Sequence, residues 1–155
     1  MISASESNEL LSSHTAVCGG AYTHSAGGSC YAYVDTPESW FDAQSFCEAT
    51  GGFLAEIQNA QQNNILKTFL SDHKAYMTWF GGYDLFQEGK WLWAHSGAPI
   101  DVFTDWHTGQ PDDAKDGENC LGLHGVWNQW NDGDCDLKFP FVCQKRMSSE
   151  VDLVG

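Results

Sequence analysis

The 155 residues, 42% of them hydrophobic and seven of them Trp, are enough for one compact domain with a core and too few for a two-domain enzyme. Twenty-one acidic residues against seven basic ones give a formal net charge of −14, which repels phosphate groups. We therefore expect neither nucleic acid nor an anionic membrane surface as a partner. The negative charge favours the binding of cations. No apolar run approaches the roughly 18 residues of a spanning helix, so we expect no membrane insertion.

The two ends of the chain differ in composition from its centre. Residues 1–17 are rich in Ser, Glu and Thr without any period, which predicts a flexible N-terminal segment. Residues 146–155 form a short polar and aliphatic C-terminal tail. We therefore expect the folded domain to span residues 18–145.

Two helices are expected in the first half of this domain. Thr36 as N-cap and Pro37 at the first helical position start the first one, which ends at the glycines 51–52. Asn59, followed three residues later by Gln62, starts a second helix that ends near residue 73. The apolar faces are Trp40, Ala43 and Cys47 in the first helix and Ile65, Leu66, Phe69 and Leu70 in the second.

Short β-prone segments alternate with these helices. They are residues 31–34, 53–57, 77–80, 120–123 and 139–144. Residues 81–132 otherwise carry two of the four Pro, much of the Gly and many Asp, which predicts mostly long loop.

Six cysteines without any C-x-x-C pair indicate a disulfide framework instead of a zinc or redox centre. Disulfides persist in oxidising compartments, so we expect a secreted, extracellular protein. Six cysteines allow about fifteen pairings, and the sequence alone does not select one.

A series of short motifs runs through the domain. They are Cys47 and the segments 53–57, 79–82, 88–93, 110–112, 118–120, 130–132 and 141–143. In this order they resemble the motifs of the C-type lectin-like domain family, in its long form with a QPD-type, calcium-dependent carbohydrate-recognition domain. The resemblance implies an α+β fold, the C-type lectin fold, with two helices packed on small antiparallel sheets, a long calcium-binding loop region and three disulfides. The implied pairs are Cys18–Cys30, Cys47–Cys143 and Cys120–Cys135.

Acidic residues dominate the segment from 105 to 136, where Lys115 is the one basic residue. The acids are Asp105, Asp112, Asp113, Asp116, Glu118, Asp132, Asp134 and Asp136. Compact folding of such a segment brings carboxylates together, which is unfavourable unless a cation lies among them. Oxygen ligands favour Ca²⁺, whereas Zn²⁺ prefers His and Cys. The resemblance maps the principal calcium site onto Gln110, Asp112, Glu118, Asn131 and Asp132, with Pro111 held cis.

The same ligands imply a carbohydrate partner. Vicinal sugar hydroxyls can coordinate Ca²⁺ while they donate to a carboxylate and accept from an amide. The resemblance associates amide first and acid second, as in Gln110 and Asp112, with galactose and N-acetylgalactosamine. The predicted sugar-binding set is Gln110, Asp112, Glu118, Asn131 and Trp127. Trp127 or His124 is a candidate ring under the sugar, with packing against the hairpin as the alternative for both.

A second calcium site is also implied by the resemblance. It maps to Asp84, Glu88, Asp113, Glu118 and Asn119. Asn119 stands where the family pattern has an acid, so this site carries less charge and we expect weaker binding.

Three other functional interpretations compete with this one. Catalysis is disfavoured because no metalloprotease, nucleophile-elbow, P-loop or dinucleotide motif is present, so we expect no enzyme. Mannose-type specificity despite the QPD motif is one alternative, and a module that binds mineral, ice or protein on the same scaffold is another. A homo-oligomer stays an open expectation, because single-site sugar binders gain avidity by assembly.

Overall fold

The computed structural model describes residues 18–113 and 117–148. The expected flexible segment 1–17, residues 114–116 and residues 149–155 of the expected tail lie outside this described part. In chain order the elements are β1 (His24–Ala26), β2 (Ser29–Glu38), α2 (Trp40–Ala49), β3 (Phe53–Leu54), α3 (Ala60–Phe69), β4 (Met77–Tyr83), β5 (Leu92–Trp93), β6 (Cys120–His124), β7 (Gln129–Gly133) and β8 (Phe139–Arg146). The expected α+β class is confirmed.

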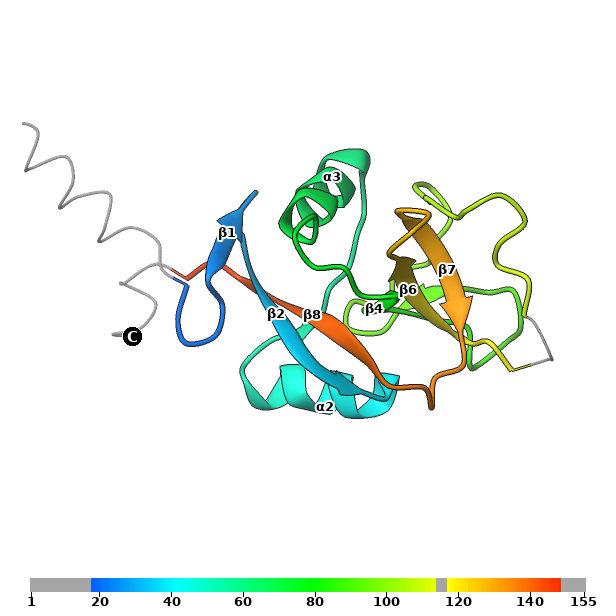
Figure 1. Ribbon diagram of the computed structural model, residues 1–155, viewed down its shortest axis with the longest axis horizontal. Coiled ribbons are helices and arrows are strands. Elements are labelled where there is room, and N and C mark those ends of the chain that lie inside the picture. The colour runs from blue at the N-terminus through cyan, green and yellow to red at the C-terminus, as the bar shows by residue number, and fades with distance from the viewer. Residues whose placement is uncertain (1–17, 114–116, 149–155) are drawn as a thin grey trace, which may run out of the picture.

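The strands form one twisted sheet in the order β1-β2-β8-β4-β6-β7, with β3 paired to β8 and β5 paired to β4. All pairs are antiparallel except β4 with β8, which meet in parallel at Trp79 and Phe141. Figure 1 shows α3 and α2 on opposite sides of β2 and β8, with the long loop region gathered at the far end around β6 and β7.

Two apolar cores lie on the two faces of this sheet, because side chains alternate along a strand. Phe141 and Cys143 of β8 pack into the core that contains Trp40 and Cys47 of α2. Val142, between them, packs into the other core with Leu66 of α3. The second core carries the aromatic residues of the loop region, Trp91, Trp93, Phe103, Trp106 and Trp130.

The start of the first helix differs from the expectation at Thr36 and Pro37. Strand β2 continues to Glu38, which pairs with Phe139 after a register shift, and its carbonyl accepts the indole N–H of Trp79 at 3.1 Å. Ser39 is the actual N-cap, and its hydroxyl accepts the Asp42 N–H. The predicted cap was wrong because a proline at a strand end beside a bulge is as acceptable as one in a first helical turn.

The second helix agrees with its predicted start. The Asn59 side chain accepts the Gln62 N–H at 2.9 Å, and the Gln62 side chain accepts the Gln58 N–H at 2.7 Å. The Asn59 side chain satisfies a donor that the first helical turn leaves unpaired, and the Gln62 side chain satisfies the N–H of the residue before the cap.

Strands β5 and β7 lie within the region expected to be mostly loop. Strand β7 has the sequence QWNDG, whose Asn, Asp and Gly have low β-propensity. It is a strand because its residues pair one to one with β6, from Cys120 with Gly133 to His124 with Gln129. The loop prediction failed here because pairing with a neighbour outweighs local propensity.

The cysteines form the pairs that the resemblance implies. Cys18–Cys30, Cys47–Cys143 and Cys120–Cys135 close separations of 12, 96 and 15 residues. The last pair joins β6 to the segment that follows β7, and so ties together the hairpin that carries the candidate site.

Candidate functional site

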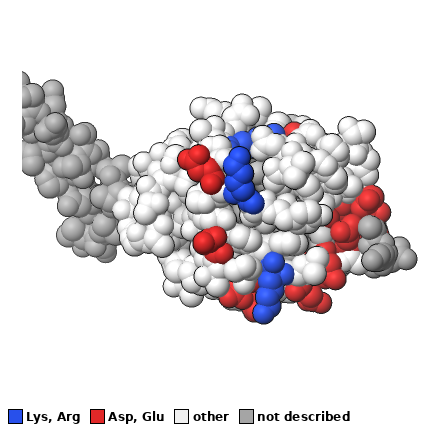
Figure 2. Space-filling model, viewed as in Figure 1, with Lys and Arg blue, Asp and Glu red and all other residues white. Residues whose placement is uncertain are grey.

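Three carboxylates from three separate segments converge at the end of the β6–β7 hairpin. Asp112 lies in the loop after the cis Gln110–Pro111 bond, Glu118 lies just before β6, and Asp132 lies on β7. One oxygen from each lies within 4.8 Å of the others. Figure 2 shows acidic side chains gathered at one end of the molecule. Such close like charges repel one another unless a cation lies among them.

Asp132 holds the loop to the strand. It is fully buried, and its two carboxylate oxygens accept the backbone N–H groups of Asp112 at 3.3 Å and Asp113 at 2.7 Å. Burial raises the pKa of Asp132, and these two hydrogen bonds only partly offset that effect. A buried carboxylate whose negative charge is destabilised by burial is well suited to a bound cation.

One amide of the predicted set, Gln110, contacts this cluster, and the other, Asn131, lies next to Asp132 along the chain. Asn131 precedes Asp132 on β7 and is half-buried. The Gln110 Nε2 atom donates to Asp112 at 3.4 Å. The Gln110 Oε1 atom is buried and has no hydrogen-bond partner within the described part of the chain. Because a buried amide oxygen without a donor is costly, this atom fits a hard cation among the three carboxylates.

The predicted second set also comes together. Asp84 is buried, its Oδ2 atom accepts the Gly89 N–H at 3.0 Å, and its Oδ1 atom has no partner among the described residues. The pKa of Glu88 is raised from 4.5 to about 7 by a hydrogen bond with Asp84 first, and then by burial and the neighbouring Asp113. Asp113 accepts the Glu118 N–H at 3.0 Å, which connects the two sets.

Asn119 takes part in this second set through its backbone. Its carbonyl oxygen accepts the Asp84 N–H at 3.1 Å. That bond holds the start of the 84–89 loop against the segment that leads into β6.

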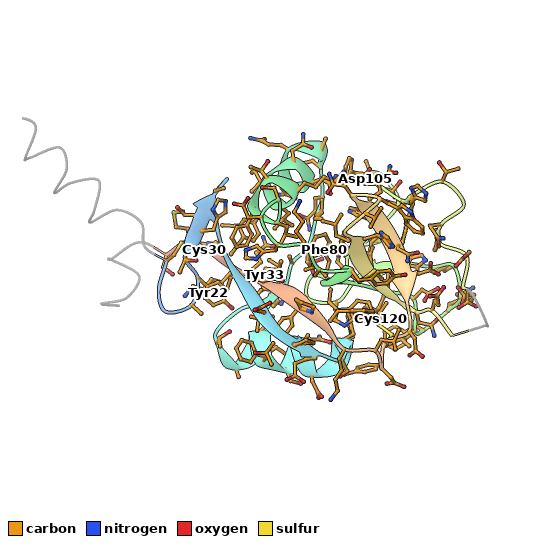
Figure 3. All side chains as sticks on the ribbon, viewed as in Figure 1. Tyr22, Cys30, Tyr33, Phe80, Asp105 and Cys120 are labelled. Atoms are coloured by element: carbon orange, nitrogen blue, oxygen red, sulfur yellow. A yellow bond between two sulfur atoms is a disulfide. The ribbon has the colours of Figure 1, made fainter. Side chains whose placement is uncertain are left out.

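Asp105 belongs to a different cluster, although it is part of the acidic run in the sequence. Its carboxylate pairs with Lys67 of α3 at 2.5 Å and accepts hydrogen bonds from Asn63 and Gln129. Figure 3 shows Asp105 beside α3. Burial acts to raise the pKa of Asp105, but Lys67 and the two amides outweigh it and lower that pKa. The basic partner comes from a distant helix, so the local sequence carried no sign of it.

Trp127, the predicted ring under the sugar, lies in the turn between β6 and β7. Its indole stacks on the imidazole of His107 at 4.1 Å and on that of His124 at 3.9 Å, with interplanar angles of 10° and 16°. The residue is 37% exposed. This arrangement corresponds to packing against the hairpin, the alternative that the sequence left open.

None of the helices within the described residues is long and apolar enough to span a membrane.

Known proteins resemble this chain over nearly all of its described part. The family model of the Lectin C-type domain matches residues 36–145. The alpha-N-acetylgalactosamine-specific lectin of Patiria pectinifera is 34% identical over 127 residues, which cover 76% of this chain and 74% of that protein. The CD209 antigen of Homo sapiens is 32% identical over 123 residues, which cover 79% of this chain.

The match to CD209 covers only 30% of that antigen, so the chain spans about a third of its length. Among solved structures, the mouse scavenger receptor C-type lectin carbohydrate-recognition domain has a TM-score of 0.76 at 30% identity. That alignment covers 84% of this chain and 98% of the mouse domain. The fold described above is therefore shared with a C-type lectin carbohydrate-recognition domain of known structure.

Proposed function

The chain belongs to the C-type lectin domain family, and from that premise we propose that it is a calcium-dependent carbohydrate-binding protein. The observation that carries the proposal is the buried Gln110 Oε1 atom without a partner in the described residues, beside the carboxylates of Asp112, Glu118 and Asp132. Carboxylate and amide oxygens are the ligands that Ca²⁺ prefers, and Ca²⁺ accepts six to eight of them. Asn131 completes the ligand set on β7.

A bound Ca²⁺ would supply free coordination positions for two vicinal sugar hydroxyls. The side chains of this chain would orient the sugar, because each hydroxyl can donate to a carboxylate and accept from an amide N–H. Gln110 and Asp112 flank Pro111, and they offer one amide and one carboxylate. Their order decides where the amide donor and the carboxylate acceptor stand around the sugar.

We assign galactose and N-acetylgalactosamine as the sugar class. The amide-first order at Gln110 and Asp112 supports this class, and so does the similarity to a lectin named for N-acetylgalactosamine. Mannose-type sugars are the second candidate, because residues around the site also contribute to selectivity. Three disulfides are consistent with a secreted, extracellular protein, and the proposed role is binding without catalysis.

A glycan array read with calcium and again after a chelator tests the proposal. We expect signal on glycans with terminal galactose or N-acetylgalactosamine that disappears with the chelator and returns with added calcium. Signal confined to mannose-type glycans would replace the sugar class. Binding that ignores the chelator, or calorimetry without calcium uptake, would remove the proposal and favour a mineral, ice or protein ligand.

The proposed second calcium site predicts an effect of Glu88→Gln on the calcium-free protein. The pKa of Glu88 is about 7 in the folded state and about 4.5 in the unfolded chain. Between these pH values the folded protein keeps a proton on Glu88 that the unfolded chain has released. The stabilisation from Glu88 is therefore complete below pH 4.5 and is lost as the pH rises through 7. Glu88→Gln removes the charge, so with chelator the variant should exceed the wild type in Tm by about 2 °C at pH 8 and match it at pH 4.

The expected difference is small because Glu88 is exposed and water screens its repulsion with Asp84. With excess calcium the same variant should bind one fewer ion in calorimetry. Glu48→Gln, an exposed glutamate on α2, is the matched control and should change neither quantity. A Tm difference that is the same at pH 4 and pH 8 would contradict the interpretation.

A further inference from the structure

A stack of three rings connects the tip of the β6–β7 hairpin to the loop that carries Gln110. We propose that Trp127 is a positioning residue for that loop and does not act as a platform under the sugar. The effect of Trp127 on calcium binding rests on the proposed function. Its effect on the order of the Gln110 backbone applies to the calcium-free protein as well.

The indole of Trp127 lies between two imidazoles. Both imidazole centroids lie about 4 Å from the indole centroid and both rings are nearly parallel to it. Two imidazoles at these distances would overlap if they lay on the same face, so His107 and His124 cover opposite faces. A sugar stacks on the open face of an aromatic ring, and with both faces of the Trp127 indole covered, mainly its edge is left exposed.

The hairpin turn fixes one side of the stack. The Nδ1 atom of His124 accepts the backbone N–H groups of Val126 and Trp127, both at 3.2 Å. The Tyr76 ring packs against the His124 imidazole at 4.8 Å and 65°, and the Tyr76 carbonyl accepts the Gly125 N–H at 2.9 Å. These contacts anchor the turn to the segment before β4, so the Trp127 indole has a rigid support.

The other side of the stack is the segment that leads into the metal-binding loop. The His107 N–H donates to the Trp130 carbonyl at 3.0 Å, and the His107 carbonyl accepts the Gln110 N–H at 2.8 Å. Its imidazole Nδ1 atom lies 3.0 Å from the Gln129 Oε1 atom. His107 is thus held from three directions, and its carbonyl fixes the backbone of the first predicted ligand.

Loss of the indole would leave the His107 imidazole unsupported on the side of the turn. The Gln110 backbone would then sample more positions, and calcium binding would have to order it again. Partners behind the direct metal ligands commonly contribute 10–100-fold to metal affinity. Since Trp127 acts through His107, we expect an effect near the lower end of that range.

The experiment compares Trp127→Leu, which removes the flat ring, with Trp127→Phe, which keeps one. In chelator, hydrogen exchange of the Gln110 amide should be about tenfold faster in Trp127→Leu than in the wild type, and Trp127→Phe should restore most of the protection. Calorimetry should give a calcium Kd about tenfold weaker for Trp127→Leu. At saturating calcium its sugar preference should be unchanged. Val126→Ala, an 83% exposed neighbour, is the matched control.

The possible outcomes separate the two proposals. Unchanged calcium affinity together with weakened sugar binding in Trp127→Leu would establish the platform role and overturn the positioning role. An unchanged rate of hydrogen exchange at the Gln110 amide in Trp127→Leu would overturn the positioning role as well. If the wild type binds no calcium, the proposed function fails, but the exchange data still decide whether Trp127 positions the loop. Should Trp127→Leu not fold, His107→Leu removes the next ring of the stack and should accelerate the same amide.

Discussion

Asp132→Asn should weaken calcium binding by about 100-fold and abolish retention of the protein on a sugar column, because it removes a full ligand charge from the site. The loop would also lose its anchor. Both Asp132 oxygens accept backbone N–H groups, from Asp112 and Asp113. An asparagine offers a single oxygen, so its NH₂ group would face one of these two N–H donors.

Asp136→Asn is the matched control for this prediction. It makes the same change in charge four residues further along, at an exposed position after the Cys135 disulfide. We expect its calcium affinity to stay within about twofold of the wild type, since long-range repulsion between exposed charges is screened at physiological salt. The calcium-free Tm of both variants should be measured as well, to separate a lost ligand from a lost fold. An Asp132→Asn protein that binds calcium as the wild type does would contradict the site.

Replacing Cys47 and Cys143 together by Ala should lower the free energy of unfolding by about 4.7 kcal/mol at 25 °C. The bridge closes a separation of 96 residues, so in the chain-entropy description it restricts the unfolded chain more than the other two bridges do. Both cysteines are fully buried and join α2 to β8. This loss is a large part of the 5–15 kcal/mol that is typical of a whole domain.

The Cys18–Cys30 pair provides the comparison within the same chain. It closes only 12 residues, so its replacement by two Ala should cost about 3 kcal/mol. Urea unfolding in excess calcium, with the slope fitted separately for each protein, gives the free energies of unfolding of the wild type and of the two double variants. Equal losses for the two double variants would show that the length of the closed loop does not determine the stabilisation.

Calcium binding should depend more on the third bridge, Cys120–Cys135, than on Cys47–Cys143. Cys120–Cys135 joins β6 to the segment after β7, and the predicted ligands Glu118 and Asp132 lie next to these two elements. The Cys47–Cys143 bridge lies in the core beneath α2, among residues that carry none of the predicted ligands. We therefore expect stability to depend most on the Cys47–Cys143 bridge and calcium affinity to depend most on the Cys120–Cys135 bridge.

The features that the sequence predicted well are those set by near neighbours. The apolar spacing of Ile65, Leu66 and Phe69 and the cap at Asn59 depend on residues within a few positions, because helical hydrogen bonds and caps are local. The even cysteine count, which is a property of the composition, indicated a disulfide framework. Local rules favoured Thr36 as the cap, but the pairing of Glu38 with Phe139 keeps this segment in β2, and the helix begins after Ser39.

Other features depend on contacts between distant segments. Strand β7 exists because β6 pairs with it, Asp105 is neutralised by Lys67 from a helix 38 positions earlier, and the cysteine pairs had several equal solutions in the sequence. Trp127 had two possible roles, and the positions of His107 and His124 bear on the choice between them.

The sequence by itself determined which chemical groups are present: a −14 charge, six cysteines, an amide and an acid on either side of Pro111, and a dense group of carboxylates. Only the tertiary structure decided which of these carboxylates meet. Asp112, Glu118 and Asp132 converge because the β6–β7 register and the hydrogen bonds of Asp132 bring three segments to one point. Charge and composition are properties of the residues, whereas convergence depends on a register that cooperative folding of the whole domain establishes.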